Sequence, residues 1–113
     1  MNANKSQKSQ KNQTFKLSES PLFNLGQIVA TPGALKRLED HGVQAVTLLN
    51  RHVHGDWRSM AVEDQKANFD AVKDGSRVFS SYCVDAQKIW VITEAVGDDG
   101  FHASSCILMP SEY

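Results

Sequence analysis

Residues 77–109 read RVFSSYCVDAQKIWVITEAVGDDGFHASSCILM, and this stretch decides the fold class. Short turn-forming segments divide it into three runs that are rich in β-branched and aromatic residues, at 77–83, 88–95 and 102–109. Consecutive strands with short links are typical of an antiparallel meander. The run IWVI at 89–92 is apolar on both faces, so we expect it at the centre of the sheet with helices over at least one side.

The chain before this sheet has helical spacing. Thr31 can accept a bond from an orphan backbone N–H, and Pro32 suits the first helical position, so a short helix should begin there and end at Gly42. Apolar residues three and four apart predict a second helix over 44–53 and a third over 63–73. The predicted fold is therefore α+β, with two or three N-terminal helices packed on a C-terminal antiparallel meander of three to four strands.

Length and composition limit the chain to one folded unit. Its 113 residues give room for one domain, and 41% hydrophobic residues are enough for one core. Residues 1–21 are rich in Asn, Gln, Ser and Lys, which predicts a disordered basic tail. Residues 22–113 should form the single α+β domain, beginning with an extended apolar segment near Phe23.

Charge and residue usage exclude several classes of function. The tail carries a net charge of +3, so the domain carries −4, and an acidic domain lacks the basic surface that binds duplex nucleic acid. No apolar run is long enough for a membrane span and no signal peptide is evident, so we expect a cytoplasmic protein without membrane contact. Cys83 and Cys106 should be reduced, buried thiols, with a cross-strand disulfide as the alternative. No nucleotide or phosphate-loop motif occurs, and no cofactor is expected.

The densest group of reactive side chains is Arg51-His52-Val53-His54-Gly55-Asp56-Trp57. Its His-x-His-x-Asp spacing resembles the metal motif of metallo-β-lactamase-like hydrolases, but those need a much larger scaffold with further ligands, so no metal is expected. His52 is a candidate catalytic acid or base, with a buried, hydrogen-bonded helix histidine as the alternative. Asp56 and Trp57 are candidate binding residues, with a cap or turn role as the alternative for Asp56.

Two further groups lie on the predicted strands. Strand alternation places Arg77 on one face of the first strand and Tyr82 on the other. Arg77 is a candidate clamp for a phosphate or carboxylate, or else a solvated strand end. The last strand contributes Ser104 as a candidate catalytic residue and His102 as a candidate binding residue, together with Tyr113 after it, or else forms the polar face of an edge strand.

With these residues in view, the region 23–113 resembles a family of short uncharacterised proteins encoded on bacterial plasmids and integrated elements. These are often labelled "plasmid-related protein" or "type I restriction endonuclease subunit M", although a methylase subunit needs a far larger chain. The resemblance rests on four segments: 23–34, Arg51-His52 with Gly55-Asp56-Trp57, IWVITE at 89–94, and PSEY at 110–113. It implies an accessory protein of a mobile element and names no activity.

In layout, helices followed by an antiparallel sheet with scattered His, Arg, Ser and Tyr are similar to the small metal-independent RNases and toxins of the barnase, colicin and RelE type. In the plasmid-encoded family an Arg and a Thr pair usually follow the central strand. Here the segment 97–105 offers only His102, Ser104 and Ser105, so an arginine at that place is missing.

Two hypotheses follow. The first is an accessory protein that acts by binding a protein partner, in host defence or counter-defence. The second is a metal-independent RNase with RNA as its partner. In it His52 is the acid or base, Arg77 stabilises the phosphorane, and Tyr82 or Ser104 positions the phosphate.

Overall fold

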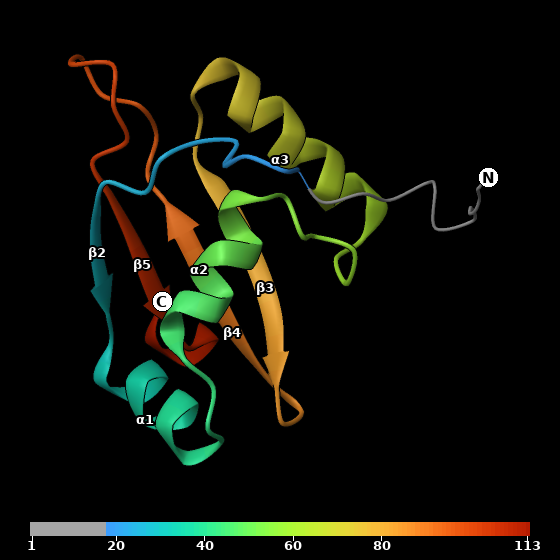
Figure 1. Cartoon of the computed structure of the whole chain (residues 1–113), viewed down its shortest axis with the longest axis vertical. Helices are drawn as coiled ribbons and strands as arrows, with labels where there is room; N and C mark the ends of the chain where they lie inside the picture. The colour runs from blue at the N-terminus through green and yellow to red at the C-terminus, as the bar shows by residue number, and fades with distance from the viewer. Residues whose placement is uncertain (1–17) are drawn as a thin grey trace.

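A computed structural model describes residues 18–113, so the expected tail at 1–21 falls largely outside the described residues. The described chain is α+β, as predicted. Its elements are β2 (Gln27–Ala30), α1 (Pro32–Asp40), α2 (Ala45–Val53), α3 (Val62–Asp74), β3 (Val78–Val84), β4 (Gln87–Thr93), β5 (Ser104–Leu108) and the short 3-10 helix η2 (Pro110–Glu112). Figure 1 shows the three helices before the main strands along the chain.

The predicted helix signals are confirmed. The Thr31 hydroxyl accepts a bond from the backbone N–H of Ala34 and so caps α1, with Pro32 in its first turn. Helix α3 ends at Gly75, whose φ of 80° is the left-handed conformation that favours glycine at this position.

The strand order in the sheet is β2-β5-β4-β3. Strands β3, β4 and β5 form the predicted antiparallel meander with β4 in its interior. The prediction of a purely antiparallel sheet is wrong for β2, which pairs parallel to β5, with Gln27 opposite Ser104. The reason is connectivity: β2 is joined to β5 through all three helices and two strands rather than through a hairpin.

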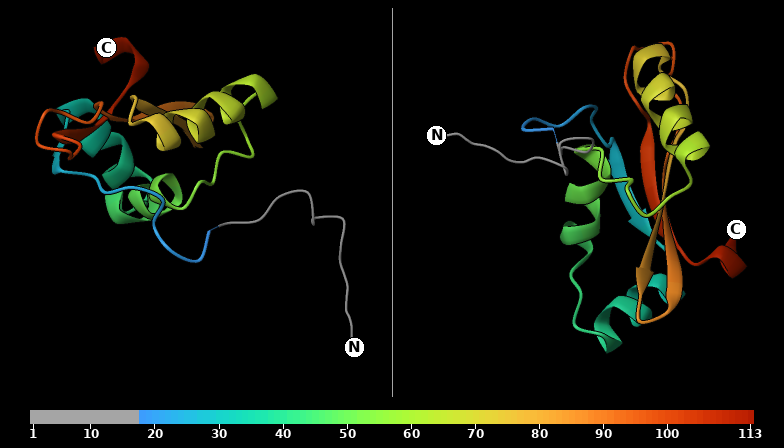
Figure 2. Two further views of the ribbon diagram at one scale, coloured as in Figure 1. Left: turned by 90° about the horizontal axis from the view of Figure 1, so that it is seen from above. Right: turned by 90° about the vertical axis from the view of Figure 1, so that its right-hand side faces the viewer.

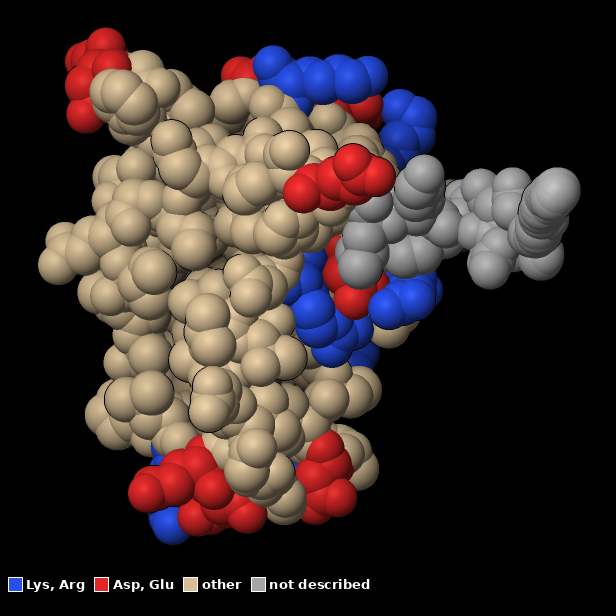
Figure 3. All heavy atoms as spheres, viewed as in Figure 1, with Lys and Arg blue, Asp and Glu red and all other residues tan. Residues whose placement is uncertain are grey.

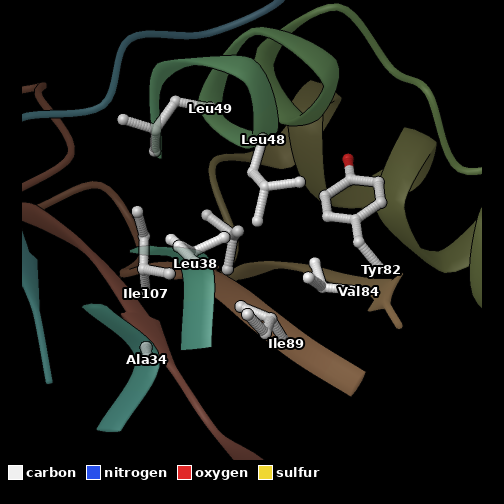
Figure 4. Close-up of a cluster of buried hydrophobic side chains, with 9 residues drawn as sticks. Ala34, Leu38, Leu48, Leu49, Tyr82, Val84, Ile89 and Ile107 are labelled. Carbon is white, nitrogen blue, oxygen red and sulfur yellow. The ribbon is translucent and has the colours of Figure 1, made fainter. Parts of the chain in front are cut away.

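The two faces of the sheet differ, and we name them by what covers them. On the helix face, α1 and α2 pack over the inward side chains of the strands, and Figure 2 shows both helices on one side of the sheet. Figure 4 shows this core, formed by Ala34, Leu38, Leu48, Leu49, Tyr82, Val84, Ile89, Val91 and Ile107. The open face carries the alternate side chains of β3 and β4: Phe79, Ser81, Cys83, Lys88, Trp90 and Ile92.

The chain end is fixed close to the open face. The Glu112 carboxylate accepts bonds from the Thr31 hydroxyl at 2.5 Å and from the backbone N–H groups of Gly33 and Met109. The bond from Thr31 contributes most, and together these bonds hold the pKa of Glu112 below its usual value. Because Glu112 ties η2 to the start of α1, Tyr113 is placed beside the sheet.

The prediction that both cysteines are buried is wrong for Cys83, which is exposed. Strand alternation turns its side chain to the open face, directly opposite Lys88. Cys106 is half-buried on β5, and both thiols are free because β4 lies between the two strands. No helix among residues 18–113 is long and apolar enough to span a bilayer.

Candidate functional site

A chain of polar side chains runs through the interior on the helix face. His52, on α2, has no exposed surface and bonds with both ring nitrogens. Its Nδ1 lies 2.5 Å from Ser80 Oγ, and the indole N–H of Trp57 donates to the same oxygen at 2.7 Å. Since Trp57 and Ser80 are also fully buried, this half of the network is shielded from solvent.

The other ring nitrogen connects His52 to β4 and β5 along the same helix face. His52 Nε2 lies 2.8 Å from Thr93 Oγ1, which in turn lies 2.6 Å from Ser105 Oγ. Ser105 donates to the backbone carbonyl of Leu25 at 2.8 Å. Three neighbouring strands and the segment before β2 are therefore connected through one imidazole.

The proton positions in this half of the network follow from the last bond. Ser105 has one hydroxyl proton and gives it to Leu25, so it must accept from Thr93. Because Thr93 donates its hydroxyl proton to Ser105, it must accept a hydrogen bond from His52 Nε2. The proton of the His52 ring therefore sits on Nε2.

The proton positions at Nδ1, Ser80 and Trp57 follow from the neutral state of the ring. Burial, with a smaller effect of the charge on His102, lowers the pKa of His52 from 6.5 to about 3, so the ring is neutral. With the proton on Nε2, Nδ1 accepts from the Ser80 hydroxyl, and Ser80 accepts from Trp57. Each hydrogen bond from Trp57 to Leu25 thus has one donor and one acceptor. These side chains form a fully satisfied structural network.

The other candidate residues from the cluster at 51–57 are also tied into the structure. Asp56 is 2% exposed, and its carboxylate bonds Arg51 at 2.7 Å and Arg58 at 3.0 Å. The Arg51 guanidinium lies 4.3 Å from the centre of the Tyr82 ring. Burial raises the pKa of Tyr82 to about 12, so this phenol stays protonated.

The four residues of the RNase hypothesis do not meet. His52 and Tyr82 are buried on the helix face. Arg77 lies just before β3 and reaches the open face, where it bonds the Tyr113 hydroxyl. Ser104 lies on β5, and β4 separates that strand from β3. No described residues bring three or more His, Cys, Asp or Glu side chains together as metal ligands.

The open face, in contrast, has an aromatic row at its surface. Phe79 packs edge-on against Trp90 with ring centres 5.0 Å apart, and Trp90 packs against Tyr113 at 5.7 Å. The Tyr113 hydroxyl accepts from Arg77 at 3.0 Å, which together with Glu94 at 3.4 Å raises the pKa of that guanidinium. Tyr113 is 69% exposed, so the row ends in solvent.

Two hollows flank this row. One, of about 340 Å³, is lined on its far side by the segment that leads into α3 and on its near side by β3 and β4: Ser59, Met60, Ala61, Asp64, Phe79, Ser81, Cys83, Lys88 and Trp90. The other, of about 300 Å³, lies toward η2 and is lined by Arg77, Phe79, Trp90, Ile92 and Tyr113. Phe79 and Trp90 line both hollows, so they stand at the centre of the candidate site.

Sequence reasoning assigned Arg77 and Tyr113 to function but took Trp90 only as the middle of the sheet. Strand alternation could have identified Trp90 as part of the site, because it places Phe79 and Trp90 on the same face of the sheet as Arg77. The structure places the other binding candidates in the interior: Trp57 is fully buried, and His102 is 8% exposed with its Nδ1 bonded to the Glu94 carbonyl.

Comparison with family models, with curated proteins and with solved structures finds no match to this chain.

Proposed function

We propose that this protein acts by binding a protein partner through the open face of its sheet, with Trp90 as the central contact. Supporting this, Trp90 is half-buried between two hollows and is flanked by Phe79 and Tyr113. Aromatic and arginine side chains in a partly desolvated setting are the residues that contribute most to protein interfaces.

Charge also supports a protein partner over nucleic acid. The domain is acidic overall, and the open face mixes Arg77 and Lys88 with Glu94 and Asp64 rather than presenting a basic stripe. On the opposite side of the molecule, Figure 3 shows a broad uncharged surface over β2 and much of α2, with charges gathered toward the margins. The resemblance to plasmid-encoded proteins suggests a partner in host defence or counter-defence.

The RNase hypothesis has no comparable support among the described residues. A general acid or base must reach the substrate, whereas His52 has no exposed surface and both of its nitrogens are engaged. The binding function therefore rests on a more direct observation, the aromatic row of half-buried Phe79 and Trp90 with exposed Tyr113 on the open face.

The test is a substitution at the centre of the row. Trp90→Ala should weaken capture of a partner from bacterial lysate at least about tenfold, because truncating a central aromatic anchor typically costs 2 kcal/mol or more, with about 1.4 kcal/mol per tenfold. Binding is measured by titrating the captured partner, once identified, against immobilised protein.

Phe101→Ala is the matched control, because Phe101 is an aromatic residue, 61% exposed, that lines neither hollow. It should leave binding within about twofold. Tyr113→Ala, at an exposed position, repeats the test without disturbing the core. If both open-face variants bind as well as the unchanged protein, the proposed surface is wrong.

A further inference from the structure

The outer edge of the sheet at β3 carries backbone groups that point away from β4. A two-residue turn, Asp85 and Ala86 with φ of 51° and 68°, joins the strands, so the flanking pair of Val84 and Gln87 is hydrogen-bonded. Antiparallel pairs alternate, so every second residue of β3 bonds β4 and those between them face outward. The outward residues are Phe79, Ser81 and Cys83.

One of these three already has a partner that imitates a neighbouring strand. The side-chain amide of Asn68, on α3, donates to the Phe79 carbonyl at 2.6 Å and accepts from the Phe79 N–H at 3.1 Å. A primary amide has the same donor and acceptor as a peptide group, and Asn68 is 4% exposed. The edge of β3 thus binds a peptide-like group at Phe79.

The pairing stops after that residue. Within residues 18–113, the backbone groups of Ser81 and Cys83 make no bond outside the sheet ladder. An unpaired strand edge is a template for a further strand. The side chains of both residues also line the hollow of about 340 Å³, whose far wall is the segment 59–61 with Asp64. Because Ser81 and Cys83 belong to both, the edge and the hollow are adjacent, and we call the two together the groove.

We propose that this groove binds an extended segment of the partner protein, which adds to β3 as a fifth strand beside Ser81 and Cys83. This inference rests on the proposed protein-binding function and assigns the form of its ligand. Backbone bonds to the edge would supply affinity, and alternate side chains of the ligand would enter the hollow over Met60 and Trp90.

The charges of the groove indicate the composition of that segment. Lys88 lies opposite Cys83 at the hairpin end, and Asp64 lies at the start of α3. Neither forms an ion pair with another residue among 18–113. A complementary ligand alternates apolar residues with polar ones and carries an acidic group for Lys88 and a basic group for Asp64.

The experiment uses a peptide selected from a randomised library displayed on phage, with the full chain as target. Ser81→Pro removes an outward N–H that the β3–β4 ladder does not use, so the fold should persist. It should weaken binding of the selected peptide at least about tenfold. Ser81→Ala keeps the N–H and should bind within about twofold.

Amide hydrogen exchange supplies a second readout that needs no variant. The amides of Ser81 and Cys83 should exchange quickly in the free protein and slowly with peptide bound, whereas those of Ser80 and Tyr82 are slow in both states. Unchanged exchange at Ser81 and Cys83 on binding would overturn strand addition, as would full binding by Ser81→Pro. If Trp90→Ala still weakens binding at least about tenfold in that case, the proposed function survives and only the added strand is lost.

Discussion

Replacing His52 with alanine should lower the free energy of unfolding by about 3 to 5 kcal/mol, the largest effect expected of any single substitution in the helix-face network. The variant leaves a cavity in a fully buried position. It also removes the acceptor of the Ser80 proton and the donor to Thr93, and each buried polar group without a partner costs about 1 to 3 kcal/mol. Urea unfolding followed by Trp fluorescence measures the change.

His54→Ala is the control for this result. His54 follows the end of the same helix, and its Nδ1 bonds the Asn50 carbonyl at an exposed site, so its loss should cost no more than about 1 kcal/mol. A His52→Ala variant as stable as His54→Ala would show that the network contributes little to folding.

The second large effect is a loss of stability in acid. The folded-state pKa of His52 is lowered to about 3 against an ordinary 6.5, so the unfolded chain binds this proton and the folded one does not. Stability from this group is therefore complete above about pH 6.5 and declines as the pH falls toward 3, by at most about 1.4 kcal/mol per pH unit. Urea unfolding at several values between about pH 4 and 6 measures the slope.

His52→Gln isolates the contribution of the imidazole. Glutamine can donate to Thr93 but does not titrate. The free energy of unfolding of His52→Gln should therefore fall less steeply with decreasing pH than that of the unchanged protein. The difference in slope should correspond to close to one bound proton. The carboxylates are common to both proteins and cancel in the comparison. Equal slopes would mean that His52 does not resist protonation in the fold.

Much of the fold could be predicted because its signals are local. Thr31 and Pro32 mark the start of α1, and Gly75 marks the end of α3, since capping depends on neighbours in sequence. The alternation in β3 likewise separates Ser80 and Tyr82 from Phe79 and Ser81, and the burial of these residues follows that pattern.

What could not be predicted depends on contacts between distant segments. The parallel pairing of β2 with β5 joins residues 77 positions apart, Gln27 and Ser104 among them, and no local pattern specifies it. Similarly, His52 looks like a reactive residue in sequence because its partners Ser80 and Thr93 lie 28 and 41 positions away. A polar residue becomes structural only when such partners satisfy it.

The two faces of the sheet differ in how much of their polar and aromatic chemistry the fold itself uses. On the helix face, the cluster of reactive side chains at 51–57 forms hydrogen bonds and ion pairs within the fold. The bonds of His52 connect α2 to the strands. On the open face, Trp90 and its neighbours line the two hollows. We therefore propose recognition at the open face, whereas the hydrogen bonds of His52 hold the interior together.

The most direct test of that account is the titration of the His52 ring by ¹⁵N nuclear magnetic resonance. We expect a neutral ring with its proton on Nε2 and no protonation until the pH approaches about 3. A ring that protonates near its ordinary 6.5, or one that carries its proton on Nδ1 at neutral pH, would contradict it and would return His52 to consideration as a catalytic group.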